Sequence, residues 1–593
     1  MYKEKYYYFD TNRIKKLNFV VIMFYLLFGI VSVRLYYIMI VKSDKYHNMA
    51  VNLWERERAI KAPRGIIYDR NGVAMANNIP VCSISVIHNQ IEDEEAVVRI
   101  LSNKLDIDKD IIRKKVQKRS VREKIKSNVP KEVADEIRTY HLKGVMIDED
   151  YKRYYPYDTL ASKVIGFTGG DNQGIIGLEV QYDKVLMGEN GSINTLTNAR
   201  GIEIKNAKER RIEPKNGKNL YTTIDINIQK YVEQEAQNAL RRHKAKRVCI
   251  ISMNPQNGEI YAYADIPEYN LNKPFEINND LNYEQNSGED NSTKKNEPTL
   301  DDYNKMWRSF CLNDTYEPGS TFKIVTATCA FEEGVLKVSD GFYCPGYKLV
   351  QDRRIRCHKA GGHGQQSFKE GIMNSCNPVF MEVGARVGTD RYYEWLQKLG
   401  LFERTGIDLP GEANSIFHKK ENVHAVELAT MSFGQSFQIT PLQLLRSVSA
   451  IINGGKLVTP HFGLYITDEN NNIVQKLEYK TKNNVISKET SEQMKELLEA
   501  VVSEGTGKRA FVEGFRIGGK TATSEKLPRS RKKYISSFLG FAPANNPKII
   551  TLILIDEPVG TYYGGTIAAP VIGGVYENVL PYIGVSREQS IEK

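Results

Sequence analysis

Three short motifs, widely separated but in a fixed order, constrain the fold of this chain more than any other feature of its sequence. They are STFK at residues 320–323, SCN at 375–377 and KTAT at 520–523. A serine one helical turn before a lysine, a hydroxyl beside an amide, and a basic strand are the parts that serine acyl transfer requires. A fold that uses all three must bring a helix, a loop and a strand together around one serine.

Ser320 is expected in the first turn of a helix. A proline and a glycine precede it, an apolar run follows at 324–331, and a glycine ends that run, which is the usual punctuation of a helix. Residues three apart share a helix face, with Cβ atoms about 5–6 Å apart, so Lys323 can reach the Ser320 hydroxyl. Burial and a second cation, Lys520, would lower the pKa of Lys323 and let it act as a base. The plainer alternative is a serine that caps an ordinary helix.

The second motif is predicted to lie in a loop, because a helical-looking stretch breaks just before Pro378. In that loop Ser375 can relay a proton and Asn377 can donate a hydrogen bond to a substrate amide carbonyl. The alternative is a simple helix cap.

The third motif precedes two strand-like runs, at 534–541 and 549–556, of which the second is almost continuously apolar. Such a run predicts a strand covered on both faces. Lys520 and Thr521 are then expected on a strand beside the serine, where a cation and a hydroxyl can hold a substrate carboxylate. The backbone N–H groups of Ser320 and Thr523 are the expected oxyanion hole, each donor worth about 3 kcal/mol in the transition state.

The three motifs, together with RGIIYDRNG at 64–72, GLE at 177–179, TTID at 222–225 and YEPGS at 316–320, make the chain resemble a class B penicillin-binding protein. The resemblance runs from about residue 50 to about 580. It implies an α+β fold with an antiparallel sheet flanked by helices. It also implies a peptidoglycan D,D-transpeptidase, whose serine is acylated by a stem peptide ending in D-Ala-D-Ala and by β-lactams. No cofactor is needed for that chemistry.

One position departs from the family pattern, because Ala522 stands where the third motif normally has glycine. A Cβ there is expected to crowd a ligand or to shift the oxyanion donor, with consequences for antibiotic affinity and resistance. Two alternative functions follow: a β-lactam sensor or catalytically weak scaffold, and a serine β-lactamase or carboxypeptidase. The sequence has no obvious carboxylate motif for deacylation. A weak pattern at 441–444 and 453–455 favours the division or sporulation type over the elongation type.

The N-terminus contains an apolar stretch long enough to cross a bilayer of about 30 Å. Residues 17–41 carry this stretch, and five basic residues precede it. The positive-inside rule places the N-terminus in the cytoplasm and the catalytic domain outside. A cleaved signal peptide is the alternative, although no small-residue cleavage site follows the stretch.

The resemblance divides the chain into five parts. They are a cytoplasmic segment at 1–16, a transmembrane helix at 17–41, an elongated pedestal resembling a dimerisation domain at 42–215, a transpeptidase domain at 216–585 and a tail at 586–593. Within the pedestal, residues 104–136 are predicted to be helical, charged and solvent-facing. Within the catalytic domain we expect a helix at 226–240 capped by Asp225, a hairpin of 248–253 with 259–264, and a polar surface insertion at 276–298.

The composition favours a folded, multidomain protein, with 41% hydrophobic and 26% charged residues over 593 positions. The net charge of +10 is dispersed among 72 acidic residues, and no nucleic-acid-binding motif accompanies it. The expected partners are peptidoglycan stem peptides, β-lactams and the membrane. A membrane-embedded glycan polymerase and division proteins are expected as further partners.

Three of the seven cysteines gather with a histidine near the second motif: Cys344, Cys357, His363 and Cys376. Three thiolates and one imidazole match a closed tetrahedral structural zinc site, and some class B penicillin-binding proteins resemble this chain in carrying zinc near the second motif. His358 is a substitute for His363. The alternatives are a Cys344–Cys357 disulfide and a Cys376 that is simply a small buried residue. The other four cysteines are interpreted as isolated core thiols.

Overall fold

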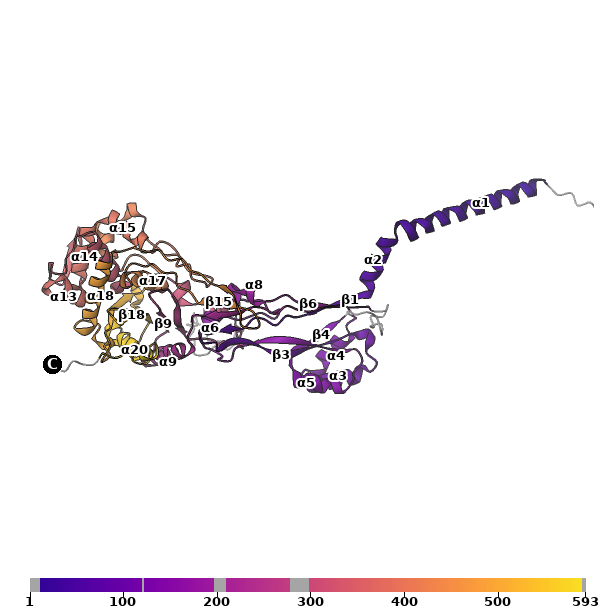
Figure 1. The fold of residues 1–593 in the computed structure, drawn as a ribbon, viewed down its shortest axis with the longest axis horizontal. Helices are drawn as coiled ribbons and strands as arrows, with labels where there is room; N and C mark the ends of the chain where they lie inside the picture. The colour runs from indigo at the N-terminus through magenta and orange to yellow at the C-terminus, as the bar shows by residue number, and fades with distance from the viewer. Residues whose placement is uncertain (1–10, 120–121, 197–209, 278–297, 589–593) are drawn as a thin grey trace, which may run out of the picture. The chain divides into compact units, whose positions relative to one another are not determined.

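A long apolar helix begins the part of the chain that the structure describes (Figure 1). This computed structural model describes residues 11–119, 122–196, 210–277 and 298–588. Helix α1 (Thr11–Tyr36) continues through a π-helical turn, η1 (Tyr37–Val41), into α2 (Ser43–Trp54). Residues Asn12–Val41 are long and apolar enough to cross a membrane, and none of the span is buried inside the protein. The helix therefore fits a single-pass membrane anchor.

The chain forms two compact units whose segments alternate along the sequence. Unit 1 comprises residues 1–62, 80–151 and 189–215, and unit 2 comprises 63–79, 152–188 and 216–593. The expected boundary near residue 216 coincides with the start of the last segment of unit 2. Two segments predicted for the pedestal, 63–79 and 152–188, instead pack with the catalytic part of the chain.

A buried ion network links these two segments of unit 2 to each other. Arg64 Nε lies 2.6 Å from Glu179 Oε2, and Arg153 Nε lies 2.7 Å from Glu179 Oε1. Arg64 also pairs with Asp183 at 2.8 Å. Charges taken out of water remain stable only when each is paired and hydrogen-bonded, so the RGIIYDRNG and GLE segments depend on each other.

Unit 1 has its own small core. Helices α3 (Glu94–Leu105), α4 (Lys109–Gln117) and α5 (Lys131–Thr139) pack with strand β4 (Glu123–Pro130) and the end of β3 (Ala74–Val86). The prediction of one solvent-facing helix at 104–136 is wrong, because β4 interrupts it and pairs antiparallel with β3. Ile112, Val116 and Ile125 are buried in this core. Strand β6 (Gly191–Leu196) pairs with both β1 (Glu55–Ile60) and β7 (Arg210–Ile212).

Unit 2 is built on a five-stranded antiparallel sheet, which confirms the predicted fold class. The strand order is β10-β9-β19-β18-β17. The bounds are β9 (Arg247–Met253), β10 (Ile260–Ile266), β17 (Gly518–Glu525), β18 (Tyr534–Ala542) and β19 (Ile549–Asp556). The predicted hairpin is β9 with β10, paired antiparallel. Strand β17, which carries the third motif, lies at one edge of the sheet.

Helices cover both faces of this sheet. On one face lie α9 (Ile226–His243) and α20 (Ala569–Tyr582), and on the other α12 (Lys323–Glu332), α17 (Pro441–Ile452) and α18 (Lys488–Ser503). Strand β19 serves both faces, because Leu552 and Leu554 belong to one core cluster while Ile553 and Ile555 belong to the other. This two-sided burial is the reason for its continuous apolar run. Asp225 caps α9 as predicted, accepting from Asn227 N and Ile228 N.

Smaller elements surround this framework. A second sheet in unit 2 orders β16 (Ile473–Lys476), β15 (Gly463–Thr467), β8 (Asn219–Thr222) and β2 (Ile67–Tyr68). Two short antiparallel pairs are β11 (Gly341–Cys344) with β14 (Gly364–Ser367), and β12 (Tyr347–Val350) with β13 (Arg353–Arg356). Most of the predicted surface insertion at 276–298 lies outside the described residues.

The other α-helices and the remaining strand lie along the chain between the elements described above. They are β5 (Val145–Tyr154), α6 (Ser162–Ile165), α7 (Gly177–Gln181), α8 (Asp183–Leu186), α10 (Leu300–Trp307), α11 (Phe310–Asn313), α13 (Phe368–Met373), α14 (Asn377–Val387), α15 (Thr389–Lys398), α16 (Ala425–Met431) and α19 (Gly564–Ile567).

Candidate active site

Ser320 lies in a 3-10 turn, η3 (Gly319–Phe322), that leads directly into α12. Gly319 has φ +58°, and a Cβ added there would lie 2.4 Å from Ser524 Oγ, so this approach to the strand requires a glycine. Gly319 N also donates to Gly434 O at 2.9 Å. The serine is thus held at a fixed position where a helix begins and its side chain faces a cleft.

Lys323 is completely buried and joins the first motif to the second. Its Nζ donates to Ser375 O at 2.7 Å, to Ser375 Oγ at 3.3 Å and to Asn377 Oδ1 at 2.7 Å. Burial lowers the pKa of Lys323 from 10.5 to about 8. A neutral amine is therefore accessible near neutral pH, and a neutral amine can accept a proton.

The second motif occupies the turn between α13 and α14. Ser375 adopts a left-handed conformation with φ +54°, and Cys376 N donates to Gly371 O at 2.9 Å. Asn377 is the first residue of α14, and the proline that follows it suits the first turn of a helix. The helix break predicted from Pro378 is therefore the junction of two helices, and the turn directs Ser375 and Asn377 towards Lys323.

The third motif alternates along β17 as a strand must. Lys520 is fully buried, and its Nζ donates to Thr521 O at 3.1 Å. Burial, and secondarily the charge of Lys323, holds the pKa of Lys520 well below its usual value. Thr521 and Thr523 line the cleft, where the Thr521 hydroxyl donates to Thr506 Oγ1 at 3.1 Å and Thr523 Oγ1 accepts from Gly564 N at 3.0 Å.

The departure at Ala522 is accommodated within the protein. Ala522 lines the cleft but is only 3% exposed. A Cβ added at Gly319 would lie 3.6 Å from the Ala522 Cβ. Most of the Ala522 methyl group therefore faces the turn before Ser320 rather than the open cleft.

The cleft has a volume of about 480 Å³ and brings together residues from all three motifs. It is lined by Gly319, Ser320, His358, Ser375, Asn377, Phe433, Gln435, Thr506, Lys508, Arg509, Thr521, Ala522, Thr523, Tyr563, Gly564, Gly565 and Thr566. Every lining residue belongs to unit 2, and none carries a carboxylate. The cleft is therefore suited to an anionic ligand.

Sequence reasoning missed one side of this cleft, formed by residues 506–509. Thr506, Lys508 and Arg509 follow α18 and lie beside the third motif. The sequence signal for this side of the cleft was Thr506 between two glycines, directly before the cations Lys508 and Arg509. Close backbone packing there favours glycine, since a Cβ at Gly505 would lie 2.9 Å from both Met373 O and Val501 O.

The expected metal ligands lie together behind the second motif. One ligand atom each from Cys344, Cys357, His363 and Cys376 falls within 4.8 Å of the other three. Cys344 ends β11, Cys376 precedes α14, and the two connecting backbones are fixed by His363 N to Cys344 O at 3.1 Å and Cys357 N to Gly346 O at 2.8 Å. In the described residues these cysteines are free thiols.

The chemistry of this four-residue cluster suits a metal. Burial lowers the pKa of His363, so its imidazole is neutral, with Nδ1 3.7 Å from Cys357 Sγ. Hydrogen bonding from Cys376 lowers the pKa of Cys357 well below its usual value, and the same bond raises the pKa of Cys376. One thiol thus ionises readily while its neighbour keeps a proton, and a cation would favour ionisation of both. His358 Nδ1 lies 3.8 Å from Cys357 Sγ and faces the catalytic cleft.

The other four cysteines, at 82, 249, 311 and 329, are buried as predicted. Two of them are not isolated. The Cys249 thiol donates to Asp265 Oδ1 at 3.2 Å and also interacts with Cys311.

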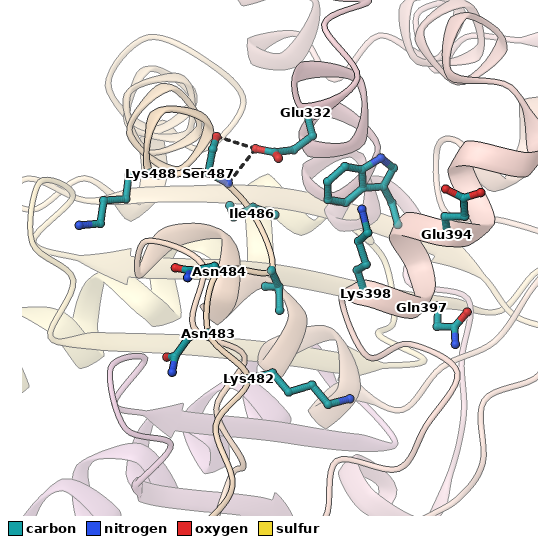
Figure 2. A pocket seen from close by; sticks show the side chains of 12 residues that line it. Glu332, Glu394, Gln397, Lys398, Lys482, Asn483, Asn484, Ile486, Ser487 and Lys488 are labelled. Atoms are coloured by element: carbon teal, nitrogen blue, oxygen red, sulfur yellow. Dashed lines mark hydrogen bonds between the residues drawn. The ribbon is translucent and has the colours of Figure 1, made fainter.

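A larger cavity of about 880 Å³ lies elsewhere in unit 2 (Figure 2). Its lining includes Lys398, Lys482, Asn483 and Asn484, and none of the three motifs contributes to it. Ser487 caps α18 at its edge and donates to Glu332 Oε1 at 2.7 Å. Because it lacks Ser320 and every other residue of the three motifs, this cavity is not the site of acyl transfer.

Comparison with known proteins agrees with this geometry. The penicillin-binding protein transpeptidase domain matches residues 248–577, and the penicillin-binding protein dimerisation domain matches residues 59–222. Stage V sporulation protein D of Bacillus subtilis is 37% identical over 589 residues, covering 98% of this chain and 88% of its own length.

Two more distant proteins extend the comparison. The probable peptidoglycan D,D-transpeptidase PenA of Neisseria gonorrhoeae is 28% identical, covering 96% of this chain and 93% of that protein. The crystal structure of penicillin-binding protein 3 from Mycobacterium tuberculosis, complexed with aztreonam, has a TM-score of 0.66 at 22% identity, covering 90% of this chain and 98% of that one.

A serine at a helix start, a buried lysine and a hydroxyl-bearing strand edge on an antiparallel sheet define a serine acyltransferase of the penicillin-recognising class. The chain belongs to the class B penicillin-binding proteins, in the branch that contains division and sporulation relatives.

Proposed function

We propose that this chain is a peptidoglycan D,D-transpeptidase, which cross-links stem peptides through an ester on Ser320 and is inhibited when β-lactams acylate the same serine. Lys323 carries the proposal. It lies one helical turn from Ser320, it is completely buried, and its amine contacts both polar members of the second motif. Its burial also lowers its pKa, which is what a general base that works near neutral pH requires.

In the acylation step, Ser320 Oγ attacks the carbonyl carbon between the two D-alanines. The serine proton passes to neutral Lys323, directly or through Ser375 Oγ, which lies 3.3 Å from the lysine Nζ. The negative charge on the carbonyl oxygen is stabilised by the N–H groups of Ser320 and Thr523. The C–N bond then breaks, and the departing D-alanine amine takes the proton back from the lysine.

In the transfer step, an amine from a neighbouring stem peptide attacks the ester carbonyl. Lys323 accepts a proton from the attacking amine and returns one to Ser320 Oγ as the ester bond breaks. The product is a new peptide cross-link and a regenerated serine. Asn377 Nδ2 is placed to donate to the amide carbonyl of the donor peptide, with the Arg356 carbonyl oxygen as its present partner at 3.3 Å.

Intact-mass spectrometry after benzylpenicillin treatment tests this proposal. We expect a single adduct of the intact drug that peptide mapping assigns to Ser320, and no adduct on a Ser320→Ala variant. An adduct on another residue, or none on well-folded protein, would overturn the proposal.

The two alternative functions make different predictions in the same assay. A serine β-lactamase or carboxypeptidase would release the adduct rapidly by hydrolysis, whereas the cleft has no carboxylate among its lining residues to activate water. We therefore expect the fluorescent-penicillin label to persist. A sensor or weak scaffold would tolerate Ser320→Ala, so complementation of a depletion strain by that variant would favour scaffolding.

We also propose that the Cys344, Cys357, His363 and Cys376 cluster binds one structural zinc ion. The donor set is that of a closed tetrahedral site, and ligand atoms about 2.1–2.3 Å from a common centre would lie less than 4 Å apart. The observed cluster, with all four ligand atoms within 4.8 Å, needs only a small contraction. The ion would fasten the β11 and β13 strand pairs to the turn that holds Ser375 and Asn377.

Metal analysis tests the zinc proposal independently of activity. We expect about one zinc per chain in the purified protein and less than one tenth as much in a Cys357→Ser/Cys376→Ser variant. A disulfide between Cys344 and Cys357, detected by mass spectrometry of alkylated peptides, would overturn it.

We further propose that the N-terminus lies in the cytoplasm and the catalytic unit outside it. The five basic residues before the apolar stretch at 17–41 support this orientation. A glycan polymerase in the membrane and proteins of the division or sporulation machinery are the expected partners. Protease protection of intact cells, in which the catalytic unit is digested and an N-terminal tag survives, tests the orientation.

A further inference from the structure

We infer that Lys508 and Arg509 recognise the free carboxylate at the end of the acyl donor, and of β-lactams, and that they are specificity-determining residues of the cleft. The inference rests on the proposed function and extends it. It assigns the charge recognition to two exposed cations outside the three motifs, rather than to the buried lysine of the third motif.

The place of these two residues follows from the contact between two threonines. Thr521 belongs to the strand that is expected to bind the terminal carboxylate, and its hydroxyl donates to Thr506 Oγ1 at 3.1 Å. Lys508 and Arg509 follow in the next turn, η5 (Lys508–Ala510), and both line the same cleft. A carboxylate bound at Thr521 therefore lies on the side of the cleft that carries two positive side chains.

The backbone beneath the two cations is firmly held. Gly507 N donates to Val501 O at 2.9 Å, and Ala510 N donates to Gly507 O at 2.8 Å. Thr506 N donates to Met373 O at 3.2 Å, which ties the turn to the helix before the second motif. Ala510 is completely buried in the sheet core. A rigid backbone that presents exposed head groups is the arrangement expected of a binding residue rather than of a solvated loop.

The head groups of Lys508 and Arg509 are available for a ligand. Both residues are exposed. In the described parts of the chain neither forms an ion pair, and the one hydrogen bond of Arg509 is a long one of 3.4 Å to Thr566 O. No carboxylate is found among the described residues that line the cleft. The two positive charges therefore remain uncompensated and attract an anion.

The buried lysine of the third motif is poorly placed for the same task. Lys520 does not line the cleft, and its Nζ donates to the backbone oxygen of Thr521. Burial beside Lys323 also favours its neutral form. The stem peptide that supplies the acceptor amine is an unsuitable ligand for the two exposed cations, because its amine is protonated in solution and would be repelled. The donor carboxylate is the group that fits.

A matched pair of inhibitors tests the inference, namely benzylpenicillin and its methyl ester, which lacks the carboxylate. The measured quantity is the ratio of their second-order rate constants for acylating Ser320. We expect Lys508→Gln/Arg509→Gln to lower the acid-to-ester ratio about fivefold, which corresponds to the loss of two exposed charge contacts. The methyl ester should react with this variant within twofold of its rate with the unmodified protein. Raising NaCl from 0.05 to 0.5 M should reduce the ratio in the unmodified protein and leave it unchanged in the variant.

An Arg241→Gln/Arg242→Gln variant is the control, because it removes the same charge from the end of α9, outside the cleft. Its acid-to-ester ratio should equal that of the unmodified protein. An unchanged ratio in Lys508→Gln/Arg509→Gln, an equal fall in the control, or an equal loss for acid and ester would each overturn the inference. If benzylpenicillin fails to acylate Ser320 in the unmodified protein, the proposed function itself fails, and the inference with it.

Discussion

The pH dependence of acylation tests the role assigned to Lys323 in detail. Only the neutral amine can take the serine proton, and the pKa of this buried lysine is lowered to about 8. The neutral fraction is then about 1% at pH 6, about 10% at pH 7 and about half at pH 8. We expect the second-order rate constant for benzylpenicillin to rise about tenfold from pH 6 to pH 7, about fivefold more by pH 8, and to level off above pH 9.

Stopped-flow fluorescence of the isolated protein measures this profile. Ser375→Ala is the matched control, because it removes the hydroxyl near Lys323 Nζ while leaving the lysine buried. Its rate should fall, yet the break in the profile should remain near pH 8. Lys323→Arg keeps the positive charge but cannot lose a proton, so its rate should fall by about 10²–10⁴. A flat profile between pH 6 and pH 8, or an active arginine variant, would refute the reasoning.

Three further predictions concern the metal cluster, the buried ion network and the third motif. If zinc fastens the second motif, a strong chelator should lower the melting temperature of the unmodified protein by at least about 5 °C and leave Cys357→Ser unchanged, as followed by circular dichroism; equal shifts in both would contradict the site. Glu179→Gln removes the carboxylate shared by Arg64 and Arg153, and should lower the free energy of unfolding by about 3–5 kcal/mol in urea titrations; a loss below about 1 kcal/mol would contradict its role in joining the segments of unit 2. Ala522→Gly removes a buried methyl group and adds backbone freedom, so it should cost about 1.5 kcal/mol and change the benzylpenicillin rate by less than threefold; a tenfold faster rate would show that the methyl group obstructs the ligand.

The parts of the site that could be predicted from the sequence are those that have a local sequence pattern. A glycine before Ser320 and a proline after Asn377 indicate a helix start and a helix break, and the strand-like runs at 534–541 and 549–556 place the third motif on a strand of the same sheet. The structure has a helix start, a junction between two helices and a strand at these positions. The four candidate metal ligands were recognisable because three of the seven cysteines and a histidine fall between residues 344 and 376.

Features that depend on contacts between residues far apart in the sequence could not be predicted in this way. Residues 508 and 509 belong to none of the three motifs, and their place in the cleft depends on long-range contacts such as the hydrogen bond between Thr506 and Thr521. The strand β4 was missed because its apolar residues, such as Ile125 and Val129, are few and lie among charges that suit an exposed helix. Residues 63–79 are held to residues 152–188 by the pairing of Arg64 with Glu179, and no local sequence pattern predicts a contact between residues so far apart.

The fate of a peptide ester on Ser320 tests the central claim most directly. The protein is mixed with a thioester donor of the form acyl-D-alanyl-thioglycolate, and its intact mass is followed before and after addition of D-alanine as the amine acceptor. The account predicts an acyl adduct on Ser320 that disappears faster when the amine is added, with the acyl-D-alanyl-D-alanine product released in matching amount. An adduct that decays only to the hydrolysed acid at every amine concentration, or no adduct at Ser320, would contradict it.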